Sequence, residues 1–193
     1  VYGMFHDYKR LNLSAISRKT NTNYQKLQYF FSESAWDINK LNDVRINILQ
    51  NQPTTRATPI GVFAIDDTGC PKPHAKNTEG AQYQYCGSLG RDENCNVAVA
   101  SCFVSNAKHF PIEFKSYIPE DQSGPNKFKS KLDLAKELIG SAIEKTILFS
   151  AIVFDAWYTS TDMIEFIASK NLILVAEAKI NRSILITHPK TKQ

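Results

Sequence analysis

The 193-residue sequence lacks the long apolar run that a membrane span requires. A transmembrane helix takes roughly 18 or more consecutive apolar residues, and no segment approaches that length. The amino-terminal VYGMFHDYKR is mixed and polar, so it also lacks the apolar core of a secretion signal. With 42% apolar and 22% charged residues, the composition is typical of a soluble globular protein, and we expect a cytoplasmic protein with no membrane partner.

Cysteine is scarce, and its spacing excludes the commonest metal motif. The chain has no CxxC pair, and only one histidine, His74, lies near the cysteines. A structural zinc site is therefore disfavoured. Reduced thiols in a cytoplasmic protein are the simpler interpretation of Cys70, Cys86, Cys95 and Cys102.

Most of the chain carries no net charge. Residues 59–193 carry fifteen Lys and Arg against fifteen Asp and Glu, whereas residues 1–58 carry eight against four. The whole excess of +4 therefore lies in the first third. A basic segment ahead of a neutral domain favours a nucleic-acid-contacting arm, with a solvated helical face as the alternative.

The first third has helical periodicity. Apolar residues recur at helical spacing in Leu11–Thr20, in YQKLQYFFSES and from Asp37 to about Gln50. The polar run TNTN between the first two helices fits a helix-turn-helix, although any small helical bundle could produce it. We predict a helical, DNA-contacting segment over residues 1–52, followed by a Pro- and Thr-containing linker at 53–59.

Residues 60–193 alternate between strand and helix patterns. A short apolar run, IGVFAI, ends on Asp66, and a long loop then extends to about Asn94. The order of elements is β-β-β-α-β-α-β, in which a three-strand antiparallel meander precedes parallel strands with crossover helices. That is the element order of an RNase H-like α/β fold. The later elements are expected at 95–104, 110–118, 132–145, 147–155, 161–170 and 171–179.

Two of the predicted strands end on an aspartate, Asp66 and Asp155. Functional groups in open α/β sheets gather at the carboxyl ends of the strands. Two adjacent carboxylates repel each other unless a cation joins them, and a pair of Mg²⁺ or Mn²⁺ ions would do so. Such a pair activates a water or 3′-hydroxyl nucleophile on a phosphodiester. The alternative is that each aspartate simply forms a turn or caps a helix.

The residues around these acids carry a family resemblance. AIDDTGCPK, IVFDAWYTS and LVAEAKINR resemble three successive blocks of insertion-sequence transposases with a DDE nuclease domain, and YQKLQYFFSESAWD resembles the helical segment before that domain. The resemblance implies metal-dependent DNA cleavage and strand transfer by an RNase H-like domain over residues 60–193. It also implies a two-metal Mg²⁺ or Mn²⁺ site, transposon-end and target DNA as partners, a homo-oligomer on DNA, and a place at the bacterial nucleoid.

The D-x-T motif of the family aligns on Asp66 and Thr68, which favours Asp66 over Asp67 as the first catalytic acid. Strand geometry alone leaves that choice open, because adjacent side chains point to opposite faces. We expect Asp67 to turn outward and cap the loop. Asp155 is the second acid by the same resemblance.

Four further residues are candidates for DNA contacts. Lys179 and Arg182, in the Lys-x-Asn-Arg motif, would hold phosphates, with ordinary surface charge as the alternative. Trp157 and Tyr158 would line the DNA groove or pack beneath the following helix, and packing is the favoured interpretation.

The third acid of the family is a Glu on a helix after the last strand, and only SILITHPKTKQ follows Arg182. Glu177 is the substitute nearest in sequence, but it is expected within a strand, where the family has no catalytic residue. We therefore expect the third acid beyond Gln193, so that this chain is an incomplete copy. The alternatives are another RNase H-like nuclease and a non-catalytic DNA-binding remnant.

Overall fold

The computed structural model describes residues 12–124, 127–180 and 183. The chain forms two compact units, Val1–Val44 and a second unit that begins at Arg45. The helices predicted for the start of the chain are confirmed: they are α1 (Leu13–Thr20), α2 (Tyr24–Ser32) and α3 (Ile38–Asn51), the last of which continues into the second unit.

The polar turn between α1 and α2 is built by asparagines. Asn21 ends α1 in the left-handed conformation, with φ of 50°, which Asn adopts more readily than most residues. The side chain of Asn23 accepts a hydrogen bond from the backbone N–H of Lys26 and so caps α2. Asn12 caps α1 in the same way through Ala15. The turn predicted from TNTN therefore forms through backbone capping.

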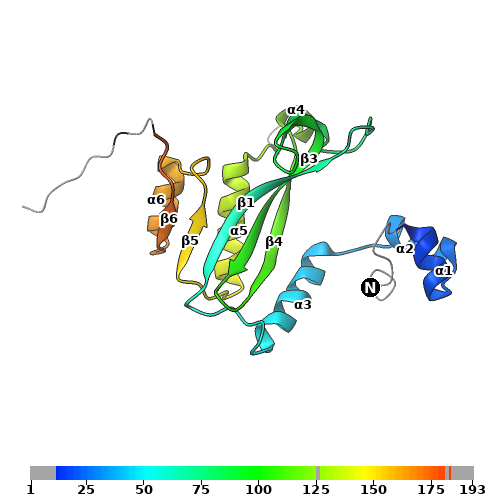
Figure 1. The fold of residues 1–193 in the computed structure, drawn as a ribbon, viewed down its shortest axis with the longest axis horizontal. Helices are drawn as coiled ribbons and strands as arrows, with labels where there is room; N and C mark the ends of the chain where they lie inside the picture. The colour runs from blue at the N-terminus through cyan, green and yellow to red at the C-terminus, as the bar shows by residue number, and fades with distance from the viewer. Residues whose placement is uncertain (1–11, 125–126, 181–182, 184–193) are drawn as a thin grey trace, which may run out of the picture. The chain divides into compact units, whose positions relative to one another are not determined.

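The second unit is a mixed sheet with helices packed on it (Figure 1). Its strands lie in the order β2-β3-β1-β5-β6, and β4 also pairs with β3. Pairing is antiparallel among β1, β2, β3 and β4, and parallel from β1 to β5 to β6. The predicted α/β fold, a meander followed by parallel strands with crossover helices, is thereby confirmed. The elements are β1 (Val62–Pro71), β2 (Gln82–Cys86), β3 (Arg91–Val104), β4 (His109–Tyr117), α4 (Glu120–Ser123), α5 (Lys131–Glu144), β5 (Ala151–Phe154), α6 (Thr161–Ser169) and β6 (Leu174–Ala176).

Two boundaries in the meander differ from the sequence prediction. Strand β1 does not end at Asp66 but continues to Pro71, because every one of its residues pairs with β3. Backbone pairing needs no apolar side chains, so the apolar run marked only the first part of the strand. The predicted loop also contains β2, which pairs with residues 91–95 and lets β3 begin at Arg91 rather than Cys95.

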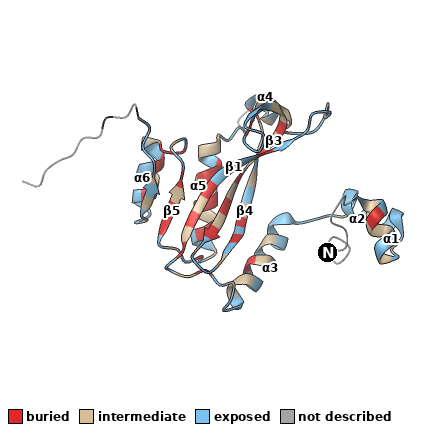
Figure 2. Ribbon diagram, viewed as in Figure 1, coloured by how far each residue is buried: buried red, intermediate tan, exposed pale blue. Residues whose placement is uncertain are grey.

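The core lies between the sheet and α5 (Figure 2). Helix α5 begins with a capping box, in which Ser130 and Asp133 each bond the other's backbone N–H. Its buried residues lie against strand residues of the same apolar cluster. No helix in the described part of the chain is long and apolar enough to span a bilayer. The buried residues of α5 are Leu134, Ala135, Leu138, Ile139 and Ala142.

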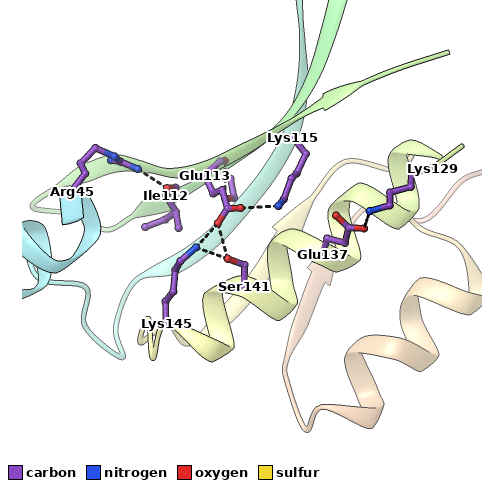
Figure 3. Close-up of polar contacts among 9 residues, drawn as sticks. Arg45, Ile112, Glu113, Lys115, Lys129, Glu137, Ser141 and Lys145 are labelled. Atoms are coloured by element: carbon purple, nitrogen blue, oxygen red, sulfur yellow. Dashed lines mark hydrogen bonds and ion pairs between the residues drawn. The ribbon is translucent and has the colours of Figure 1, made fainter. Parts of the chain in front are cut away.

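A charged network ties β4 to α5 (Figure 3). The Glu113 carboxylate of β4 accepts hydrogen bonds from Ser141 at 2.6 Å and Lys145 at 2.8 Å, and pairs with Lys115 at 3.0 Å. Burial by itself raises the pKa of Glu113, but the hydrogen bonds from Lys145, Ser141 and Lys115 outweigh it and lower the pKa to about 2. Nearby, Arg45 of α3 donates hydrogen bonds to two backbone carbonyls of β4, so α3 and α5 both bond to this strand.

Replacing Glu113 with Gln should lower the free energy of unfolding by about 2 kcal/mol at pH 7, because Lys145 and Lys115 lose their counter-charge. The folded-state pKa lies below the unfolded one, so this stabilisation is present above about pH 4.5 and disappears as the pH falls towards 2. Urea unfolding of the parent and Glu113→Gln proteins at pH 7 and pH 3 measures it. A difference between the two proteins that stays constant with pH would contradict the assignment.

Candidate functional site

The parallel pairing of β1 and β5 brings Asp66 and Asp155 to the same level of the sheet. The two strands pair from Val62 opposite Ala151 to Ala64 opposite Val153. Continuing that register by two residues places Asp66 opposite Asp155. Neighbouring strands lie about 4.8 Å apart, so the two aspartates are neighbours where β5 ends, and the charge of Asp155 acts on Asp66.

The two acids also share a face. Side chains alternate along a strand, and Phe63 and Ile65 of β1 are buried towards the core. Asp66 therefore lies on the opposite, more open face, and its side chain is exposed. Asp155 follows the buried Phe154 and is likewise exposed.

The sequence predicted that Asp67 turns outward and caps a loop, and this prediction is wrong. Because β1 continues through it, alternation turns Asp67 to the side of Phe63 and Ile65, where it forms an ion pair with Lys131 at the start of α5. Only 29% of the Asp67 side chain and 20% of the Lys131 side chain are exposed. The partner of Asp67 is thus a lysine rather than solvent.

Electrostatic repulsion acts on Asp66. Burial raises the pKa of Asp66, and the negative charges of Asp67 and Asp155 raise it further. The backbone N–H of Asp67, 2.8 Å from Asp66 Oδ1, and the charge of Lys131 act in the opposite direction. A bound cation would relieve this repulsion.

Gly69 lies two residues beyond Asp67. It lies within β1 and is buried, because β2 passes directly over it. A Cβ at this position would lie 2.6 Å from Cys86 Sγ and 2.9 Å from Cys86 Cα. The glycine therefore permits close approach of two strands next to the acids. Cys86 is one of four free cysteines.

Tyr158 and Trp157 follow Asp155 in a tight turn. The backbone N–H of Trp157 donates to Asp155 Oδ1 at 3.0 Å, so this aspartate also stabilises the turn. Tyr158 is only 1% exposed and lies in the core, whereas the Trp157 ring is half exposed. Burial, together with the charges of Asp67, Asp66 and Asp155, raises the pKa of Tyr158. Its hydroxyl, buried beside the acids, has no hydrogen-bond partner among the described residues.

The remaining predicted site residues lie at or beyond the end of β6. That strand ends at Ala176, so Glu177 follows it rather than lying within it, contrary to the sequence prediction. Ala176 of β6 pairs with Phe154 of β5, so the residues that follow these strands, Glu177 and Asp155, are neighbours. Lys179 is exposed three residues beyond the strand. Arg182 lies outside the described residues.

Lys131 is the site residue that the sequence analysis missed. It is 64 residues from Asp67 in the chain, and no motif joins them. One weak signal was present: a lysine in the first turn of a helix opposes the helix dipole, so it needs a nearby negative charge. Asp67 supplies that charge.

The carboxylates of Asp66 and Asp155 could serve as two ligands of a divalent cation. Asp66 and Asp155 offer carboxylate oxygens, which Mg²⁺ and Mn²⁺ prefer, and their repulsion favours a cation between them. In the described ranges, no group of three or more His, Cys, Asp and Glu side chains is arranged to hold a metal ion. The other ligands would be water or substrate phosphate oxygens, as is usual for Mg²⁺.

Comparison with known proteins found a transposase relative. The chain is 30% identical over 189 residues to a protein of Microchaete diplosiphon described as a probable transposase for insertion sequence element IS701. The match covers 95% of this chain and 48% of the relative, so the chain spans about half the length of that relative.

Solved structures show only distant likeness. The Drosophila P element transposase strand transfer complex matches with 11% identity and a TM-score of 0.31, covering 86% of this chain and 37% of that chain. The large terminase of a thermophilic bacteriophage matches with 11% identity and a TM-score of 0.32, covering 67% and 26%. Scores this low carry no argument about function. In contrast, the family model described as DDE superfamily endonuclease matches residues 1–193, and the chain therefore belongs to that family, as its motifs predicted.

Proposed function

We propose that this chain is part of an insertion-sequence transposase that cleaves and transfers DNA strands, with Asp66 and Asp155 as two of its three catalytic carboxylates. The observation that carries the proposal is the parallel register of β1 and β5, which aligns these two acids on one open face. Family membership and the insertion-sequence relative support it. Transposases act on DNA, and we propose transposon ends and target DNA as the partners, bound by a homo-oligomer.

The neighbouring residues would each contribute to the site. Asp66 and Asp155 would hold Mg²⁺ or Mn²⁺, which when bound activates the nucleophile and stabilises the leaving oxygen of the phosphodiester. Tyr158, buried beside the acids, closes the core side of the site to water. The half-exposed Trp157 ring offers a flat surface to a nucleotide, and Lys179 offers a charge to a phosphate. We assign Arg182 the same role as Lys179, whereas the buried Tyr158 is not available to DNA.

The third acid is not assigned to a described residue. Glu177 is adjacent to Asp155 in the sheet, but neither Glu177 nor Asp67 completes a metal-holding group. We further propose a helical DNA-contacting segment at 1–52, a linker at 53–59 and the nuclease domain from residue 60. The positive charge of the first third supports that division.

Metal binding tests the proposal directly. Replacing Asp66 or Asp155 with Asn should weaken Mn²⁺ binding at least about tenfold, because each variant removes one charged oxygen ligand. Free Mn²⁺ can be measured by its electron paramagnetic resonance signal during titration of the full chain. Asp92→Asn is the matched control, because Asp92 is an exposed acid on β3 and should leave the affinity unchanged. Equal affinity in all four proteins would refute the metal site.

A further inference from the structure

The ammonium group of Lys131 is held by three side chains beside the candidate site. It forms an ion pair with Asp67 and lies 5.7 Å from the ring centroid of Tyr117 and 5.5 Å from that of Trp157. Two aromatic faces and a carboxylate thus surround one cation. Trp157 also donates its backbone N–H to Asp155, so the Lys131 cradle and the second acid share a residue.

This position has an electrostatic cost that the three acids offset. Lys131 is the first residue of α5, where the helix dipole disfavours positive charge. Its side chain is only 20% exposed, so water compensates little of that cost. The negative charges of Asp67 and Asp155 both act on Asp66. The positive charge of Lys131 acts on Asp66 as well, and it pairs directly with Asp67. Lys131 therefore neutralises part of the charge that a divalent cation would otherwise neutralise.

We propose that Lys131 is the built-in counter-ion of the carboxylates and competes with the divalent cation for them. This inference rests on the proposed function, because it requires Asp66 and Asp155 to be the metal ligands. The ammonium keeps the acids together without metal, and its positive charge lowers their affinity for metal. Alternation along β1 turns Asp67 away from the open face that presents Asp66, and Asp67 is engaged by Lys131 instead of serving as a ligand.

Removing the charge should strengthen metal binding. Lys131→Met keeps most of the side-chain volume and should bind Mn²⁺ at least roughly tenfold more tightly than the parent. One unit charge about 6 Å from a divalent ion has that effect even at the dielectric constant of water. Lys131→Arg keeps the charge and should retain the affinity of the parent. Titration followed by the resonance of free Mn²⁺, without DNA, measures binding rather than activity. Thermal unfolding of each variant verifies that it is folded.

Lys136→Met provides the matched control. Lys136 is on the same helix, forms an ion pair with Asp162 and lies 5.6 Å from the Phe166 ring centroid, so the substitution removes the same kinds of contact away from the acids. Its Mn²⁺ affinity should equal that of the parent. If Lys131→Met binds Mn²⁺ no more tightly than the parent while Asp66→Asn and Asp155→Asn lose binding, the counter-ion role is refuted and the metal site stands. If the two Asn variants also bind like the parent, both proposals fail.

Discussion

Replacing Asp66 or Asp155 with Asn should reduce Mn²⁺-dependent nicking of supercoiled plasmid at least about a hundredfold. Asn has nearly the same shape as Asp but lacks the charge that holds the metal, which contributes several kcal/mol of transition-state stabilisation. A hundredfold loss corresponds to about 2.7 kcal/mol. The conversion of supercoiled to open-circular DNA on a gel measures the rate.

The control for this experiment is Asp92→Asn, which removes an exposed acid from β3 and should nick at the parental rate. Nicking by the parent that persists in Asp66→Asn would show that another residue is the first acid. Binding of DNA by the parent without any nicking would instead favour a DNA-binding remnant of a transposase. That result would fit the absence of a third metal-binding side chain among the described residues.

Replacing Phe63 with Ala should lower the free energy of unfolding by about 3–5 kcal/mol. Phe63 is 0% exposed and stacks on Phe149 with ring centroids 5.1 Å apart. It also lies opposite Ile152 of β5, in the pairing that aligns Asp66 with Asp155. The loss would consume a large share of the roughly 5–15 kcal/mol that stabilises a typical domain. Urea unfolding followed by circular dichroism measures the change.

Phe114→Ala is the comparison that isolates burial. Phe114 is on β4 of the same sheet but is 62% exposed, so its removal leaves little cavity and should cost less than about 1 kcal/mol. Similar losses in the two variants would mean that the core does not centre on β1. If the loss of the Phe63 ring shifts the register between β1 and β5, this variant should also bind Mn²⁺ more weakly, because that register aligns Asp66 with Asp155.

Much of the second unit could be predicted from local patterns. The helix at α5 was predicted to within one residue at each end, because its apolar residues recur at helical spacing. Strand β5 was predicted from its continuous apolar run, but it spans Ala151–Phe154 rather than 147–155, so that Asp155 follows the strand instead of ending it. Strand β2 was missed, because QYQYC has no apolar run and is a strand by virtue of its backbone pairing with β3. The end of β1 was misplaced for the same reason, since its polar half is a strand only by virtue of β3.

The candidate site shows the same division. The flanking motifs predicted Asp66 and Asp155 as catalytic acids, and the family that these motifs indicated is the one the chain belongs to. The role of Asp67 could not be predicted, since it depends on which face β1 turns towards α5 and on a lysine far away in the chain. For Trp157 and Tyr158 the sequence favoured packing, and the structure buries Tyr158 but leaves Trp157 half exposed.

Local periodicity and short motifs were enough to predict the family and the α/β class, both of which are confirmed. The same motifs singled out Asp66 and Asp155 as candidate catalytic acids, which stays a prediction. Only the tertiary structure decided that Asp66 and Asp155 lie side by side on an open face while Asp67 is paired with Lys131. The physical reason is that strand pairing and helix docking join residues that are far apart in the chain. Those distant neighbours set the electrostatic balance of this site, on which the proposed metal affinity would depend.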